Sequence, residues 1–252
     1  MTGPRARVVA AHLSLQFSDS RRAQRRDLRR LFARARDRGY WWITGTEAGD
    51  DDLAAMLQAE AAEAGYRVHR WASVWVAVAD SRITRPTSWE TGHVPVLAAH
   101  ASHTGPHGRR GIAWCSWTTK HLGRVTVGAA HYLTGGRRPG DPNYHLNTRM
   151  TRAVGEWARD RGRGRDLVFY GGDQNIGDRH LDTFRGQPLT TVWDELGRHP
   201  DTGHGNIDVI ASYDPDGRVQ AIRARSLADG EFHLATDHYL VEAVYQVRPL
   251  PI

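Results

Sequence analysis

The sequence predicts an α/β fold in which strands outnumber helices. Short runs of branched and aromatic residues, separated by glycine, proline and aspartate, recur along most of the 252 residues, as expected for strands joined by turns. Three longer segments repeat apolar residues at helical spacing instead. No internal repeat, low-complexity linker or change in composition divides the chain. We therefore expect a single domain that spans residues 1–252.

The first quarter of the chain alternates strand and helix. Leu28, Leu31 and Phe32 recur at helical spacing, and a later segment has acids in its first turn and Gly65 at its end, as helices prefer. The expected elements are a strand, a helix, a strand and a helix: residues 6–16, 18–39, 40–48 and 51–65.

The remaining sequence is rich in strand signals and contains one further helix. The expected strands are residues 66–71, 73–79, 94–100, 111–117, 124–133, 166–173, 205–213 and 238–247. The expected helix covers residues 145–162, between the fifth and sixth of these strands.

Composition excludes several classes of protein. Hydrophobic residues make up 40% and charged residues 25%, which allows a sizeable core and argues against a disordered polyelectrolyte. The apolar runs are too short to span a bilayer, and the first residues lack the apolar stretch of a signal peptide. Cys115 is the only cysteine, so neither disulfides nor a cysteine-based zinc site is expected. We expect a cytoplasmic monomer with no membrane partner.

The charge balance indicates a polyanionic partner. Basic residues outnumber acidic ones by 34 to 28, and all but Lys120 are arginines, whose planar guanidinium suits phosphate. A genome rich in G and C would favour arginine codons equally well. Nine arginines fall in residues 21–38, and there a solvated helix is the preferred interpretation over a DNA-binding surface.

Titratable side chains lie in or at the ends of several expected strands, where a sheet can hold them rigidly around one cleft. An acid at a strand end often only caps a turn, but so many together indicate a catalytic centre. These residues are Glu47, His131, Asp173, Asp208, Asp237 and His238, and the amide Asn175 follows Asp173 by two positions.

The motifs around these residues resemble those of the endonuclease/exonuclease/phosphatase superfamily. They are GTEA at 45–48, AAHYL at 129–133, YGGDQN at 170–175, NIDVI at 206–210 and TDH at 236–238. They stand in the family's order and, with the first strand, span residues 12–238. The resemblance implies a four-layer α/β sandwich, in which two mixed, mostly antiparallel sheets pack face to face between outer helices.

Phosphodiester cleavage requires charge neutralisation and an activated water. Glu47 is a hard oxygen ligand suited to Mg²⁺ or Mn²⁺. Asp173 is the expected acceptor of the proton of the attacking water, and Asn175 is expected to orient that water or hold the phosphate. On extended backbone, a spacing of two places both side chains on one side.

The resemblance supplies four further roles. His238 is expected to donate to a phosphate oxygen and, in its charged form, to stabilise the transition state. Asp208 would be the carboxylate behind that imidazole. Asp237 resembles a second carboxylate on the metal side, and His131 matches a histidine that contacts the scissile phosphate.

His12 departs from the family pattern, because the first strand usually ends there in a T-x-N motif. Imidazole is a poorer ligand for Mg²⁺ than for Mn²⁺, so one hypothesis is a His12 metal ligand with Mn²⁺ at least as effective as Mg²⁺. The other is that His12 donates a hydrogen bond to phosphate as the asparagine would. Lost activity is a third alternative, which the other matching motifs disfavour.

Basic residues close in sequence to the predicted catalytic residues are candidates for phosphate contacts. Arg137 and Arg138 follow His131 in a glycine- and proline-rich loop and are expected to reach a backbone phosphate. Arg149, in the following helix, is a weaker candidate.

These inferences predict a metal-dependent hydrolase of DNA or RNA phosphodiesters, with Mg²⁺ or Mn²⁺ as cofactor. A phosphatase or phosphodiesterase for a small or lipid-borne phosphate is the alternative, because one fold can host many activities. A non-catalytic nucleic-acid-binding protein is a third possibility, but it has no need of Asp173, Asp208 and His238.

Overall fold

The structure is a computed structural model. It describes residues 5–15, 20–98, 109–136, 138–175, 186–198, 207–227 and 238–250, together with the single residues 184, 202, 232, 234 and 236.

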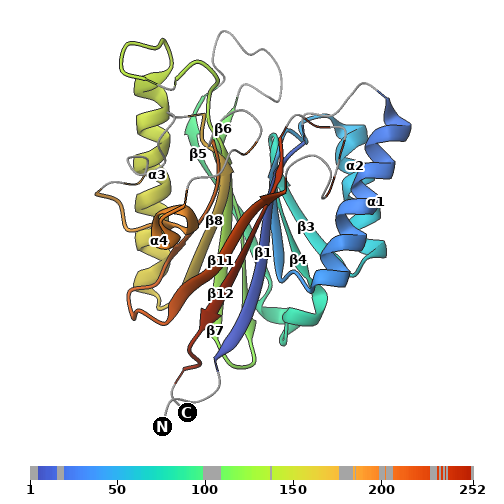
Figure 1. Ribbon diagram of the computed structural model, residues 1–252, viewed down its shortest axis with the longest axis vertical. Coiled ribbons are helices and arrows are strands. Elements are labelled where there is room, and N and C mark those ends of the chain that lie inside the picture. Colours follow the sequence, from blue (N-terminus) through green and yellow to red (C-terminus); the bar gives the residue numbers. More distant parts are fainter. Residues whose placement is uncertain are drawn as a thin grey trace.

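Two six-stranded sheets pack face to face (Figure 1). The first sheet has the strand order β11 (Val219–Leu227), β12 (Leu240–Val247), β1 (Ala6–Ser14), β2 (Trp42–Thr46), β4 (Val74–Ala79) and β3 (Tyr66–Trp71). The second sheet has the order β5 (Glu90–Leu97), β6 (Arg110–Thr119), β7 (Gly123–His131), β8 (Leu167–Asp173), β10 (Asp208–Tyr213) and β9 (Thr190–Thr191).

Helices form the outer layers (Figure 1). Helices α1 (Arg21–Arg38) and α2 (Asp51–Glu63) lie outside the first sheet, and α3 (Tyr144–Arg163) lies outside the second. The short α4 (Val192–Leu196) packs against β10 and β11, at one side of the sandwich. Two 3₁₀ turns, Asp80–Arg82 and Pro86–Ser88, connect β4 to β5. The predicted four-layer sandwich is confirmed.

Two parallel strand pairs determine where the strand ends meet. Most neighbours are antiparallel, but β1 pairs with β2 and β7 pairs with β8 in parallel. Parallel neighbours need a long crossover, which α1 supplies in the first sheet and α3 in the second. The carboxyl ends of β1 and β2 therefore share one edge of their sheet, and those of β7 and β8 share an edge of theirs.

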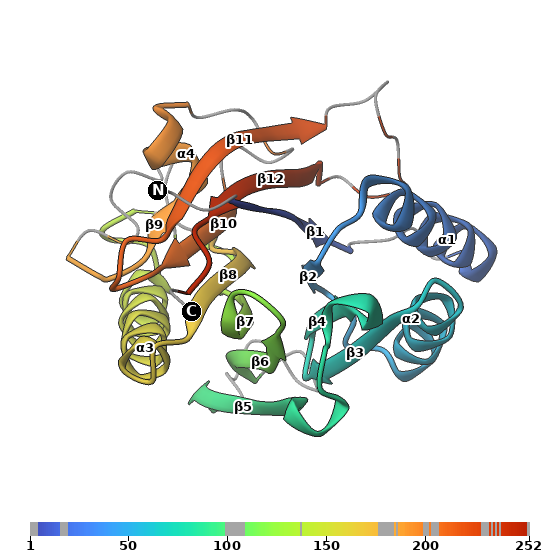
Figure 2. The ribbon, with the colours of Figure 1, turned by 90° about the horizontal axis from the view of Figure 1, so that it is seen from below.

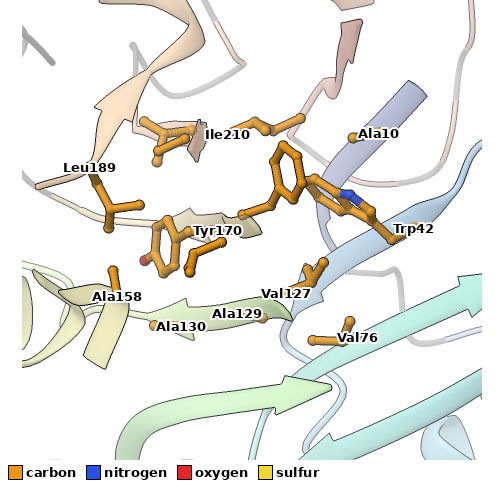
Figure 3. Packing of buried hydrophobic residues seen from close by; sticks show 14 of the residues in the cluster. Ala10, Trp42, Val76, Val127, Ala129, Ala130, Ala158, Tyr170, Leu189 and Ile210 are labelled. Atoms are coloured by element: carbon orange, nitrogen blue, oxygen red, sulfur yellow. The ribbon is translucent and has the colours of Figure 1, made fainter. Parts of the chain in front are cut away.

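The two faces of the first sheet bury separate hydrophobic clusters. Between the sheets, the Phe169 ring lies 5.8 Å from Trp42 and 5.1 Å from Tyr245. Figure 3 shows Val76 of the first sheet facing Val127 of the second. The outer cluster lies between the first sheet and helices α1 and α2. None of the described helices is both long and apolar enough to cross a bilayer.

Strand β11 is the main element that the sequence did not predict; the two-residue β9 and the short α4 were also missed. Ala221 and Ala224 of β11 face the inter-sheet core, but they lie three residues apart, and Arg223 and Arg225 interrupt the apolar pattern. A register shift between Ala221 and Arg223 also displaces the pattern by one residue, and such a shift reverses which side chains face the core.

Candidate active site

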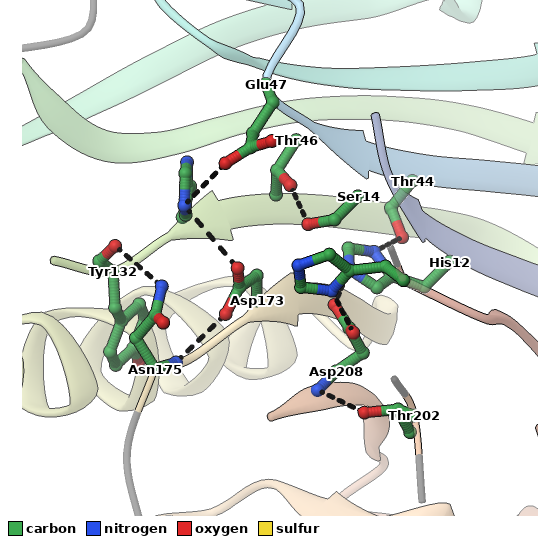
Figure 4. A network of polar contacts seen from close by, with 12 residues as sticks. His12, Ser14, Thr44, Thr46, Glu47, Tyr132, Asp173, Asn175, Thr202 and Asp208 are labelled. Carbon is green, nitrogen blue, oxygen red and sulfur yellow. Dashed lines mark hydrogen bonds and ion pairs between the residues drawn. The ribbon is translucent and has the colours of Figure 1, made fainter. Parts of the chain in front are cut away.

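The predicted catalytic and metal-binding residues that the structure describes lie at or near strand ends that meet at one end of the sandwich, and Figure 4 shows their polar contacts. His12 lies near the end of β1, Glu47 directly follows β2, and His131 ends β7. Strand β8 ends at Asp173 and β10 begins at Asp208. Asn175 lies two residues after β8, and His238 lies two residues before β12. Asp237 lies outside the described residues.

Asp208 is held between two histidines. Its Oδ2 accepts a hydrogen bond of 2.6 Å from Nδ1 of His238, and its Oδ1 lies 3.2 Å from Nε2 of His12. The other ring nitrogen of His12, Nδ1, lies 3.0 Å from the Thr44 hydroxyl. Asp208 and His12 are completely buried, so this chain of contacts is shielded from water. Both nitrogens of His12 therefore face protein oxygens.

Asp173 sits directly opposite Asp208 in the antiparallel register of β8 and β10, but it contacts other groups. Its Oδ1 accepts the backbone N–H of Asn175 at 3.0 Å, and its Oδ2 lies 3.5 Å from Nε2 of His131. The same nitrogen lies 3.7 Å from Oε1 of Glu47. His131 therefore links the carboxylates at the ends of β2 and β8, one from each sheet.

The backbone departs from extended geometry at two of these residues. Glu47 has φ 66 and Asn175 has φ 45, in the left-handed region that residues other than glycine seldom occupy. The extended backbone expected from Asp173 to Asn175 is therefore wrong, because β8 ends at Asp173 and the chain turns at Asn175. The turn lets the Asn175 amide donate to the Tyr132 carbonyl at 3.3 Å. Such conformations persist where the surrounding structure enforces them.

The glycines of the YGGD segment give the two sheets room to approach. A Cβ on Gly171 would lie 2.0 Å from the hydroxyl oxygen of Thr44, the residue that contacts His12. A Cβ on Gly172 would lie 2.6 Å from the carbonyl oxygen of Ala130. Any larger residue would move these groups, so the glycines set the distance between β8 and its neighbours.

Thr236 ties the segment before β12 to the first strand. Its hydroxyl donates to the Ser14 carbonyl at 2.9 Å and accepts the backbone N–H of His238 at 3.3 Å. The Ser14 hydroxyl in turn bonds to that of Thr46 at the end of β2. These contacts give the threonine of the TDH motif a role in placing His238.

The two facing aspartates have opposite pKa shifts. Burial, together with the charges of Asp208 and Glu47, raises the pKa of Asp173 well above its usual value. Burial alone would also raise the pKa of Asp208, but His238 and His12 outweigh it, and its pKa falls below the usual range.

His131 is also shifted. Burial, followed by the positive charges of Arg110 and His238, lowers the pKa of His131 well below its usual value. At neutral pH this imidazole is therefore uncharged, with one ring N–H to donate.

Comparison with known proteins rests on structure. No protein-family model matches the chain, and no curated protein matches its sequence. A structure of TDP2 from D. rerio with a single-stranded DNA product aligns with a TM-score of 0.72 at 12% identity, covering 95% of this chain and 99% of that one. An endonuclease/exonuclease/phosphatase protein from Bacteroides vulgatus aligns with a TM-score of 0.70 at 13% identity, covering 96% and 99%.

This chain has the endonuclease/exonuclease/phosphatase fold. A mannosyl-6-phosphatase from Bacteroides thetaiotaomicron shares it, with a TM-score of 0.62 at 12% identity over 94% of this chain and 99% of that one. The fold is thus common to a protein crystallised with a DNA product and to one named as a sugar phosphatase.

The donor set at the strand ends of this endonuclease/exonuclease/phosphatase fold fits a hard divalent cation. The carboxylates of Glu47 and Asp173 approach the same ring nitrogen, so they border one space, and Mg²⁺ prefers one or two such oxygens together with water. Asp173, Asp208 and His238 form a second grouping, whose ligand atoms all lie within 4.8 Å of one another. The Glu47 side chain is 25% exposed, which leaves this side of the site open to solvent.

Sequence reasoning missed Arg110 as a residue of the site. Its side chain is buried at the start of β6, and its charge acts on His131, Asp173 and Glu47. The sequence feature that could have pointed to Arg110 is a pair of arginines immediately before an apolar strand. Thr44 was missed too, because it reads as an ordinary strand residue.

The predicted phosphate-binding arginines are less well placed by the structure. Arg138 and Arg149 are exposed, the first before α3 and the second on it, and Arg137 lies outside the described residues. Their phosphate contacts stay predictions.

Proposed function

We propose that this protein is a divalent-metal-dependent phosphodiester hydrolase that acts on DNA or RNA. The observation that carries the proposal is the pair of facing carboxylates, Asp173 and Asp208, whose surroundings shift their pKa values in opposite directions. Two acids with separated pKa values are suited to different roles in one reaction. The fold, the net charge of +6 and the DNA product bound to TDP2 of D. rerio support this substrate class.

Asp173 is the proposed proton acceptor for the attacking water. A carboxylate whose pKa is raised toward neutrality is a stronger base than an ordinary one, and burial against Asp208 and Glu47 raises that of Asp173. The backbone N–H of Asn175 fixes one of its oxygens, which orients the carboxylate. Asn175 itself is held by the Tyr132 carbonyl and is proposed to position the water or the phosphate.

Asp208 is the proposed fixed anion behind His238. Nδ1 of His238 donates to Asp208, and the other ring nitrogen is the one proposed to donate to a phosphate oxygen. The buried carboxylate also stabilises the imidazolium form, so His238 can support negative charge that develops on the phosphate. His131, uncharged at neutral pH, is proposed to donate one hydrogen bond to the same phosphate.

Glu47 is the proposed principal ligand of Mg²⁺ or Mn²⁺, with Asp237 as the predicted second carboxylate. A bound divalent cation would neutralise phosphate charge and favour ionisation of water.

For His12, we infer a positioning role. With one ring nitrogen near Thr44 and the other near Asp208, its contacts favour hydrogen bonding over coordination of a metal. It would then orient Asp208 from the side opposite His238.

A phosphatase acting on a small phosphate is the second candidate. Its support is the mannosyl-6-phosphatase that shares the fold. The two candidates differ in substrate and share the same proposed proton acceptor.

A cleavage panel tests the proposal. Single- and double-stranded DNA, RNA, a small phosphodiester and a sugar phosphate would be offered with Mg²⁺, with Mn²⁺ or with chelator. The variants would be Asp173→Asn and, as a control, Asp160→Asn, an exposed acid at the far end of α3. We expect metal-dependent cleavage of a polynucleotide that Asp173→Asn abolishes and Asp160→Asn retains. Turnover of the sugar phosphate alone would establish the second candidate, and no turnover of any substrate would reject both.

A further inference from the structure

A face covered by arginines lies outside the first sheet. Strands β1, β11 and β12 direct alternate residues away from the inter-sheet core, and the C-terminal half of α1 borders them. In Figure 2, α1 lies beside this outer side and α4 lies at the edge of β11 toward β10, so neither helix covers it. We call this surface the outer arginine face, made of Arg5, Arg7, Arg34, Arg38, Arg223 and Arg225.

Only one carboxylate, Glu242, lies among these six guanidinium groups in the described part of the chain. Arg34 and Arg225 both bind it, at 2.8 and 2.6 Å. Arg5 instead donates to two neutral amides, Gln220 at 3.3 Å and Gln246 at 3.0 Å. A cation held by neutral partners keeps its full charge, so the face has a large excess of positive charge.

Four members of the face make no ion pair with any residue that the structure describes: Arg5, Arg7, Arg38 and Arg223. Arg7, Arg38 and Arg223 are exposed. With Arg225 they line a hollow of about 50 Å³. Guanidinium groups that lack an internal acid are the ones free to bind an external anion.

The arginines at the start of α1 differ in this respect. They line a larger hollow of about 1140 Å³ between α1 and α2, but acids already bind most of them. Arg21 pairs with Asp50 and Asp52, and Glu60 pairs with two more arginines, Arg25 and Arg29. Charge complementarity to a polyanion therefore favours the outer arginine face.

We propose that the outer arginine face binds the phosphate backbone of a nucleic acid strand that continues beyond the reaction centre. The proposal rests on the proposed nuclease function for its choice of polyanion. Strand β1 carries both Arg7 and His12, which are about 17 Å apart on an extended strand, and β12 begins two residues after His238. A bound strand would thus run from the catalytic end of the first sheet over the edge onto its outer side. Such contacts position a substrate without reading its sequence.

Binding without catalysis tests the proposal. Fluorescence anisotropy of a labelled single-stranded DNA of about 20 nucleotides, long enough for several phosphate contacts, would be measured in EDTA over a range of salt. The test variant combines Arg7→Gln, Arg38→Gln and Arg223→Gln. The matched control combines Arg159→Gln, Arg163→Gln and Arg165→Gln, which removes the same charge at the far end of α3 and just beyond it. Thermal melting would confirm that all three proteins are folded.

We expect the test variant to bind at least about 10-fold more weakly, with a salt slope smaller by about 2, since each lost contact to a single strand contributes about 0.7. The control should bind within about twofold of the wild type. Hydrolysis of a small phosphodiester should be the same in all three proteins, since such a substrate does not reach the face.

Three results would overturn the proposal: unchanged binding by the test variant, an equal loss in both triple variants, or binding that is specific to anionic lipid vesicles and absent for DNA. This assay contains no metal and requires no turnover. Failure of the proposed hydrolase function would therefore be seen separately, as no turnover of any substrate in the cleavage panel.

Discussion

Asp173 and Asp208 are the same residue type, directly opposed on neighbouring strands and almost equally buried, yet their chemistry differs. Two histidines flank Asp208, and its ionised form is therefore favoured. Asp173 has one backbone N–H at hydrogen-bond distance and a histidine at 3.5 Å, while Asp208 and Glu47 disfavour its charge. Burial disfavours the charged form of both, and their neighbours decide which of the two has the raised pKa.

The largest expected effect separates the two acids by activity. Asp173→Asn removes the proposed proton acceptor, and we expect kcat to fall by about 10²–10⁴-fold, the contribution typical of general base catalysis. Asn has nearly the same shape, so substrate binding should change little. Single-turnover cleavage together with metal-free DNA binding would measure the two quantities. A variant that kept near wild-type kcat would remove Asp173 from the mechanism.

Stability should change in opposite directions at the two positions. Asp208→Asn leaves two buried histidines without their shared anion, and we expect a loss of about 3–5 kcal/mol, as for other broken buried pairs. Asp173→Asn removes a charge that the fold disfavours, and the metal-free protein should melt higher than the wild type at neutral pH. Chemical denaturation of both variants in EDTA would measure this, and a shift of the same sign at both positions would contradict the comparison.

The pH dependence should differ in the same way. A raised folded-state pKa means that Asp173 lowers stability increasingly as pH rises from its unfolded value of about 4 through the folded value. The advantage of Asp173→Asn should thus be small near pH 4 and grow toward neutrality. Asp208, with a lowered pKa, contributes stability that is present above about pH 4 and is lost as pH falls toward its folded value. Denaturation at several pH values would show whether the two curves diverge in this way.

A smaller effect is expected at His12. Asparagine, the residue of the family pattern, is shorter and would give up the contact with Asp208, so we expect His12→Asn to lower kcat by about 10-fold, as loss of an orienting partner does. The ratio of activity in Mn²⁺ to that in Mg²⁺ should stay the same, since both ring nitrogens of His12 face protein oxygens. A marked fall in that ratio would instead make His12 a metal ligand.

The smallest change tests the support behind Asp208. Gly171→Ala would place a methyl group against the Thr44 hydroxyl and displace the contact between Thr44 and His12. We expect a loss of about 1–3 kcal/mol, typical of overpacking, and a modest fall in activity. Gly164→Ala is the milder control, because its Cβ would meet nothing closer than the Arg161 carbonyl oxygen at 3.3 Å, against 2.0 Å at Gly171. Equal stability of the two variants would mean that the close approach of β8 to β2 is not required.

The strands that carry the site were predictable because each joins an apolar run to a titratable residue at or near its end. His131, Asp173 and Asp208 were placed in this way, and the structure brings them together. Arg110 was not foreseen, because the burial of an arginine depends on which distant strands pack around it. The left-handed turn at Asn175 was also missed: asparagine adopts that conformation more readily than most residues, but the residue type alone does not require it.

Strand β11 shows the same limit at the level of the fold. Its arginines interrupt the apolar alternation that identifies a strand. The register shift between Ala221 and Arg223 also displaces the remaining apolar residues by one position. The positive charge of this sequence was visible from composition, but its collection on one sheet face was not. Pairing of β11 with β12, at positions far from the arginines of β1 and α1 in sequence, creates that face.

The most direct test of the division of roles is a titration of the two carboxyl carbons by ¹³C NMR in the metal-free protein, assigned with Asp173→Asn and Asp208→Asn. We expect the Asp173 carboxyl carbon to titrate with a midpoint well above the usual aspartate pKa of about 4. The Asp208 carboxyl group should remain ionised at pH values below that usual pKa. Two similar midpoints, or the reverse order, would contradict the assignment of Asp173 as the base and Asp208 as the fixed anion.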